Sequence, residues 1–195
     1  MVIPSLYLHE NKQLVRRSNK VHVLFHLCSH IDDTIFIYRK HTFLKNTFIR
    51  KGSLIMLKGI PSIISPELLK IMMEMGHGDE IVIGDGNFPG ASMGQRLVRC
   101  DGHDAPTLLE AMLKLFPLDT YAKPVYLMAK VPGDTVETPI WDTYKQIIKP
   151  YTNEEPEMIE RFAFYERAKK AYCVIQTGES ALYANIILKK GVVTE

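Results

Sequence analysis

Residues 65–84 of the chain read SPELLKIMMEMGHGDEIVIG, a stretch that joins a capped helix to a short buried strand. Ser65 is a residue type that caps helices, and Pro66 suits the first helical position. An apolar stripe follows on one helical face, formed by Leu68, Leu69, Met72 and Met73. The apolar run 81–83, between a glutamate and a glycine, is typical of a buried strand. This stretch therefore predicts an α/β domain.

The alternation of helices and strands continues to the end of the chain. Predicted helices follow Asp104, begin at Thr138 and cover 164–171, and predicted strands cover 124–131, 172–177 and 185–188. Such alternation favours a layered α/β fold, with a largely parallel or mixed sheet and helices on its faces.

The net charge of +2 over 195 residues hides a division near Met56. Residues 1–55 carry nine Lys/Arg and three Asp/Glu, whereas residues 56–195 carry fifteen and nineteen. The second part also holds eleven of the twelve glycines and ten of the eleven prolines, which punctuate folded domains. We expect a compact domain over 56–195 and a basic, poorly ordered extension over 1–55. Translation that starts at Met56 is an open alternative.

One histidine has unusual neighbours. His77 stands between Gly76 and Gly78, where the predicted helix gives way to the predicted strand. No neighbouring side chain shields it, and imidazoles exchange protons near neutral pH. Asp85 follows the strand, at the position where α/β sheets bind ligands. The structural alternative is that His77 ends the helix and Asp85 caps a turn, and spacing leaves both interpretations open.

Motifs for common cofactors and nucleophiles are absent from the sequence. There is no Gly-x-Gly-x-x-Gly, no phosphate-binding loop, no Gly-x-Ser-x-Gly elbow and no His-Glu-x-x-His. Cys28, Cys100 and Cys173 form no Cys-x-x-Cys pair, which favours a reducing, cytoplasmic location over disulfides or structural zinc. No run of about 18 apolar residues predicts a transmembrane helix. What remains is proton transfer without metal or cofactor, or a plain binding pocket.

A series of short motifs carries a more specific signal. In order they are Ile64–Leu69, Met75–Ile81, Asp85 with Asn87–Pro89, Leu118–Tyr121, Arg161–Ala171, and Thr177–Glu179 with Tyr183–Asn185. Each motif is weak by itself, but their order over residues 56–193 resembles the family that includes L-fucose mutarotase and bacterial D-ribose pyranase.

This resemblance implies an isomerase that interconverts the α and β anomers of a free monosaccharide, without metal or cofactor. It implies that His77 is the catalytic proton-transfer residue, with a second group that the sequence does not identify. It also implies sugar contacts from Asp85, Asp119, Arg161, Tyr165, Tyr183 and Asn185. A homo-oligomeric ring, commonly a decamer, is implied too, with the sugar site near a subunit boundary. A neighbouring subunit could then cover Phe88, Trp141, Phe162 and Phe164; the alternative, which periodicity leaves open, is that they pack into the domain's own core.

Several alternatives stay open. The segments Gly76–Glu80 and Asn87–Pro89 favour L-fucose as the substrate. Tyr183-Ala184-Asn185 departs from the Tyr-Gly-Asn usual in the fucose enzymes, so D-ribose is a second candidate. A non-catalytic sugar-binding protein on the same fold is a third possibility. The fourth is a nucleic-acid or membrane-surface adaptor that uses 1–55, but that segment lacks a binding motif, and we expect neither partner.

Overall fold

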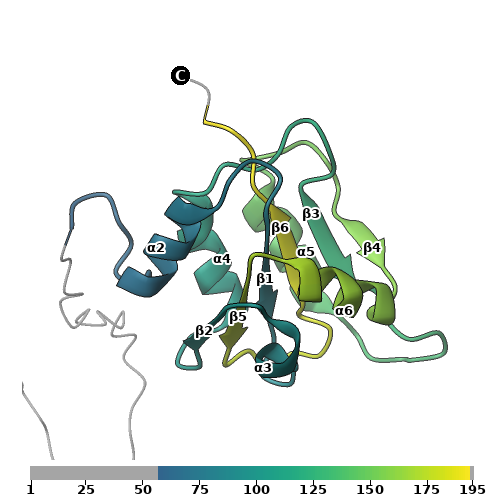
Figure 1. Cartoon of the computed structure of the whole chain (residues 1–195). Helices are drawn as coiled ribbons and strands as arrows, with labels where there is room; N and C mark the ends of the chain where they lie inside the picture. The colour runs from purple at the N-terminus through teal and green to yellow at the C-terminus, as the bar shows by residue number, and fades with distance from the viewer. Residues whose placement is uncertain (1–56, 194–195) are drawn as a thin grey trace, which may run out of the picture. The chain divides into compact units, whose positions relative to one another are not determined.

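The computed structural model describes residues 57–193, so the expectation for residues 1–55 lies outside the described residues (Figure 1). Its helices are α2 (Pro66–Glu74), α3 (Gly90–Met93), α4 (Ala105–Leu113), α5 (Pro139–Ile148) and α6 (Arg161–Lys170). Its strands are β1 (Glu80–Gly84), β2 (Leu97–Cys100), β3 (Val125–Met128), β4 (Glu157–Ile159), β5 (Cys173–Thr177) and β6 (Ile186–Lys189). None of the helices in this part of the chain is long and apolar enough to cross a membrane.

The six strands form one mixed sheet in the order β2-β5-β1-β6-β3-β4. Strand β5 pairs in parallel with both β2 and β1, and β3 pairs in parallel with β4. Strand β6 is antiparallel to both of its neighbours, β1 and β3. The predicted layered α/β fold is confirmed, and its sheet takes the mixed form.

Helices cover both faces of the sheet (Figure 1). Helices α2, α4 and α5 pack on one face, where they meet Ile81 and Ile83 of β1. Helix α6 packs on the other face, against Val82. Successive side chains of a strand point to opposite faces, so the apolar run of β1 serves both cores.

Side-chain caps determine where two of the predicted helices begin. The Ser65 hydroxyl oxygen accepts a hydrogen bond from the Leu68 N–H at 3.1 Å. Asp104 Oδ1 accepts one from the Thr107 N–H at 2.7 Å. Each bond satisfies one of the N–H groups that the first helical turn leaves free. The starts of α2 and α4 therefore agree with the prediction.

Helix α6 begins three residues before the predicted start. Its cap is Glu160, whose Oε2 accepts hydrogen bonds from Phe162 N–H at 2.7 Å and Ala163 N–H at 3.1 Å. The helix therefore starts at Arg161, and the predicted range 164–171 was wrong at this end. Glutamate is not among the usual capping residues, so the sequence pattern gave no start signal here.

Two strands, β2 and β4, were not predicted, and they are the two edges of the sheet. Edge strands lack the continuous apolar run of a central strand. Arg99 interrupts β2, and all three residues of β4 are at least partly exposed. The predicted strand 124–131 is shorter than expected, because only Val125–Met128 pairs within the sheet.

The aromatic residues expected at a subunit surface divide into two groups. Phe88 is 5% exposed and Phe164 is 0% exposed, and their rings meet edge to face with centroids 6.0 Å apart. A neighbouring subunit is therefore not needed to cover these two side chains. Phe164 of α6 packs against Phe88, in the turn after β1 of the same chain. Trp141 is half-buried against the domain core. Phe162 remains 63% exposed.

Asp104→Ala is expected to lower the free energy of unfolding by about 1 kcal/mol at neutral pH, because α4 loses its cap. Burial raises the pKa of Asp104, but the hydrogen bonds from Thr107 outweigh it and leave the pKa below the ordinary value of 3.8. A lowered pKa stabilises the fold above the unfolded-state value, and this stabilisation is lost as pH falls through the folded-state value. The difference between the proteins should therefore shrink below pH 3.8.

Urea unfolding at a fixed protein concentration measures this difference. The matched control is Glu110→Ala on the same helix, whose carboxylate is 61% exposed and 3.3 Å from Lys114 Nζ. It should change the free energy of unfolding by no more than about 0.5 kcal/mol. Equal losses for the two variants at neutral pH would contradict the capping role of Asp104.

Candidate active site

A buried polar pair lies where β1 ends and β6 begins. The Asp85 N–H donates to Asn185 Oδ1 at 2.9 Å, and Asn185 Nδ2 donates back to Asp85 Oδ2 at 2.8 Å. The Asn87 N–H donates to Asp85 Oδ1 at 3.0 Å. Burial raises the pKa of the Asp85 carboxyl, and these hydrogen bonds offset only part of that rise. The carboxylate is thus fixed in position and shielded from water.

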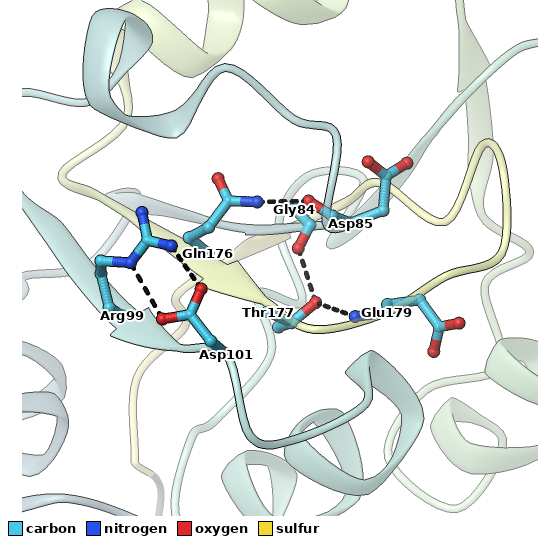
Figure 2. A network of polar contacts seen from close by, with 7 residues as sticks. All are labelled: Gly84, Asp85, Arg99, Asp101, Gln176, Thr177 and Glu179. Atoms are coloured by element: carbon cyan, nitrogen blue, oxygen red, sulfur yellow. Dashed lines mark hydrogen bonds and ion pairs between the residues drawn. The ribbon is translucent and has the colours of Figure 1, made fainter.

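Strand β5 holds the backbone that carries Asp85. Figure 2 shows Gln176 and Thr177 converging on the backbone of Gly84 and Asp85. The Thr177 hydroxyl donates to the Gly84 carbonyl at 2.7 Å, and the Gln176 amide donates to the Asp85 carbonyl. The Gly86 N–H donates to the Glu179 carbonyl at 2.8 Å. The loop after β1 is therefore anchored on its backbone as well as on its side chain.

A cavity of about 190 Å³ opens beside this pair. Its lining comes from the loop after β1, the end of β3 and the loop that follows it, the start of α6 and the segment before β6: Asp85, Asn87, Phe88, Met128, Asp134, Arg161, Tyr165, Leu182, Tyr183 and Asn185. The set mixes a guanidinium donor, carboxylate acceptors, amides and phenols, which together can read the hydroxyl groups of a small polyol. Five of the six predicted sugar-contacting residues meet here.

Sequence reasoning missed three residues that shape this cavity. Asn87 and Asp134 line it, and Trp141 donates its indole N–H to the Tyr183 carbonyl at 2.9 Å. Asn87 belongs to one of the sequence motifs but was not assigned to the site. The Pro-Gly-Asp turn at 132–134 marks a turn in sequence, but nothing in it shows that its carboxylate reaches Tyr183.

His77 lies at the other end of the sheet, with the remaining predicted contact. Its Nε2 is 3.3 Å from Asp119 Oδ1, and its ring meets the Tyr121 ring with centroids 5.6 Å apart. Asp119 is buried, whereas the His77 side chain is 47% exposed. Burial raises the pKa of the Asp119 carboxyl, but hydrogen bonds from the Tyr121 N–H and from His77 outweigh it and hold the pKa below its usual value.

The segment that carries His77 needs its glycines. Gly78 has a φ of +86°, in the left-handed region that favours glycine. Its N–H donates to the Lys190 carbonyl at 2.8 Å, which ties the segment to the end of β6. Asp79 Oδ2 accepts a hydrogen bond from the Gly76 N–H at 2.7 Å. His77 is therefore presented on a defined turn.

Within one chain the two groups do not meet. His77 precedes β1 and Asp85 follows it, and a strand of this length spans about 16 Å. That distance is far beyond hydrogen-bond reach. Asp119 contacts His77 and does not line the cavity. The chain thus carries two separate groups of candidate site residues, which we name the cavity half-site, around Asp85, and the histidine half-site, around His77.

Comparison with known proteins places the chain in a family. The family model described as the RbsD / FucU transport protein family matches residues 58–193. Fucose mutarotase from Danio rerio is 50% identical over 147 residues, which cover 72% of this chain and 96% of the relative.

Two solved structures give the same result. FucU from Bifidobacterium longum is 59% identical, with a TM-score of 0.69 over 70% of this chain and 100% of its own. The fucose mutarotase in complex with L-fucose from Streptococcus pneumoniae is 52% identical, with a TM-score of 0.68 over 71% of this chain and 100% of its own. These matches confirm the family resemblance of the motifs, and the chain belongs to the RbsD / FucU transport protein family.

Proposed function

We propose that this protein is an isomerase that interconverts the α and β anomers of L-fucose. The observation that carries the proposal is the cavity half-site, where Asp85, Arg161, Tyr165, Tyr183 and Asn185 converge on one small polar cavity. The names of the relatives, and the complex of one of them with L-fucose, favour L-fucose over D-ribose. The presence of His77 on an exposed turn favours an enzyme over a protein that only binds the sugar.

The reaction needs one acid and one base. A proton goes to the ring oxygen while the anomeric hydroxyl loses one, the bond between C1 and the ring oxygen breaks, and an aldehyde forms. Rotation about the C1–C2 bond exposes the other aldehyde face. The reverse transfers then close the ring to the other anomer, so protons and electrons balance without a cofactor.

In this proposal His77 is a proton-transfer residue and Asp119 acts through it. The lowered pKa of Asp119 keeps its carboxylate ionised at neutral pH. A carboxylate beside Nε2 holds the proton on that nitrogen, which leaves Nδ1 to exchange a proton with the sugar. Asp119 is then a positioning residue rather than a sugar contact.

Assembly is part of the proposal, because the histidine half-site of one chain must reach the cavity half-site of another. The proposed contact is head-to-tail, and copies joined in this way close into a ring where the rotation between neighbours closes. The ring, and the decamer made by stacking two rings, are supported by exposed apolar side chains at both half-sites. Tyr121 beside His77 is 77% exposed, and Leu182 at the cavity is 49% exposed.

The proposal extends to the location and the domain boundary. Cys100 and Cys173 are free and buried, which suits a reducing cytoplasm. We further propose that 56–195 is the mutarotase domain, because every residue of both half-sites lies within it. No nucleic-acid or membrane partner is part of the proposal.

His77→Ala is expected to slow anomer exchange of L-fucose by about 100-fold or more, since general acid–base catalysis contributes at least that much. Exchange NMR between the α and β anomers, with and without protein, measures the rate. The control is His103→Ala, which removes an exposed imidazole from the turn before α4 and should keep the rate within about twofold. Full exchange by the His77 variant would refute its catalytic role, and no exchange by the unchanged protein would refute the proposed function.

A chain that starts at Met56 is expected to fold and to exchange the anomers of L-fucose as fast as the full chain. The capped helices, the sheet and both half-sites all lie beyond that residue. Circular dichroism and exchange NMR on the two proteins make the comparison. Lost solubility or activity of the shorter chain would show that residues 1–55 contribute to the domain.

A further inference from the structure

The backbone of Tyr183 is held in an unusual conformation. Its φ is +59°, the one positive value for a residue other than glycine among residues 57–193. Such a conformation costs about 1–3 kcal/mol for a bulky residue and persists only where the surroundings hold it. Helix α5 supplies the restraint, since Trp141 donates to the Tyr183 carbonyl at 2.9 Å and Tyr144 donates to the Ala184 carbonyl at 2.8 Å. Tyr183 is thereby directed to the cavity that it lines.

The hydroxyl hydrogen of Tyr183 is already engaged. It is donated to the carboxylate of Asp134, which lines the same cavity. A phenol has one hydrogen to donate and lone pairs that accept. With its hydrogen directed to Asp134, the Tyr183 oxygen can only accept: it accepts a long hydrogen bond from the Val131 N–H at 3.4 Å, and its other lone pair can accept from a ligand.

The carboxylate of Asp134 is fixed before any ligand arrives. Its loop turns at Gly133, which has a φ of +87°. The Asp134 N–H donates to the Val131 carbonyl at 3.0 Å, and Asp134 Oδ1 accepts from the Val136 N–H at 2.9 Å. Lys130 Nζ donates to the Val136 carbonyl at 3.0 Å, which closes the loop on itself. This geometry leaves the second oxygen of the carboxylate for Tyr183.

We propose that Asp134 is a positioning residue that makes the Tyr183 hydroxyl a hydrogen-bond acceptor for one hydroxyl group of the sugar. This rests on the proposed function, in which the sugar occupies the cavity half-site. Of the other ionisable groups that line the same cavity, the Arg161 guanidinium only donates, whereas the Asp85 carboxyl accepts from Asn87 and Asn185. An acceptor at Tyr183 therefore adds a second point at which a sugar hydroxyl must be a donor, and so contributes to specificity.

The test is a double-mutant cycle on the full chain, with the exchange rate measured against L-fucose concentration. Asp134→Ala and Tyr183→Phe should each raise KM by about tenfold and leave kcat within about twofold, because each removes binding shared by ground and transition states. The double variant should be no worse than either single one, because each substitution breaks the same interaction. Additive losses, or an unchanged Asp134→Ala protein, would overturn the proposal.

Two further variants separate positioning from general damage. Asp134→Asn has one acceptor oxygen for the two bonds that the carboxylate accepts from Val136 and Tyr183, so with that oxygen on the Val136 N–H its amide nitrogen donates to Tyr183, and the affinity for L-fucose should stay as low as in Asp134→Ala. Glu137→Ala removes an exposed carboxylate from the same loop and should leave KM unchanged. If Asp134→Asn keeps the affinity of the unchanged protein for L-fucose, or if Glu137→Ala raises KM equally, the specific role of Asp134 is refuted.

A spectroscopic readout covers the case in which Asp134→Ala does not fold. The hydrogen bond to Asp134 raises the pKa of Tyr183, against smaller opposing effects of the Val131 N–H and the Arg161 charge. In protein with ¹³Cζ-labelled tyrosine, the Tyr183 signal is assigned by its absence in Tyr183→Phe. Its pKa should fall in Asp134→Asn, and an unchanged pKa would overturn the proposal. An unchanged protein that shows no anomer exchange would instead refute the proposed function alone.

Discussion

Strand β6 runs antiparallel to β1 in the middle of the sheet, and this pairing determines the surroundings of both half-sites. The register pairs Glu80 with Lys189 at one end and Ile83 with Ile186 at the other. The residue before β6 therefore lies beside the residue after β1, which is why Asn185 and Asp85 exchange two hydrogen bonds. A parallel β6 would place the start of that strand at the opposite end of β1.

Electrostatics differ between the two ends of β1 in a way that suits separate tasks. Each oxygen of the buried Asp85 carboxyl accepts one hydrogen bond, and no buried side-chain nitrogen or oxygen within residues 57–193 lacks a partner. Such a group is a preorganised acceptor that need not reorient when a ligand binds. At the other end, the exposed imidazole of His77 rests on the ionised and buried Asp119. An exposed imidazole is accessible to a neighbouring chain, whereas a buried one is accessible only within its own.

The sequence predicted the central strands and the capped helices, because their signals are local. Ser65 and Asp104 are usual capping residues, and Ile81–Ile83 is an uninterrupted apolar run. The edge strands β2 and β4 were missed because half-exposed strands carry no such run. For the candidate site, the motifs indicated candidate residues but not their distribution between two places in the fold. The separation of His77 from Asp85 follows from strand length and direction, and the bond between Asp134 and Tyr183 joins residues 49 apart in sequence.

Subunit complementation tests most directly whether two chains share one site. His77→Ala removes the histidine half-site, and Asp85→Asn removes the carboxylate of the cavity half-site with little change in shape. Each variant alone should be inactive in L-fucose exchange NMR. After the two are mixed in equal amounts, unfolded and refolded together, about a quarter of the head-to-tail contacts should pair an intact His77 with an intact Asp85. If two chains share one site, exchange returns to about a quarter of the unchanged rate; a mixture as inactive as its components would contradict a shared site.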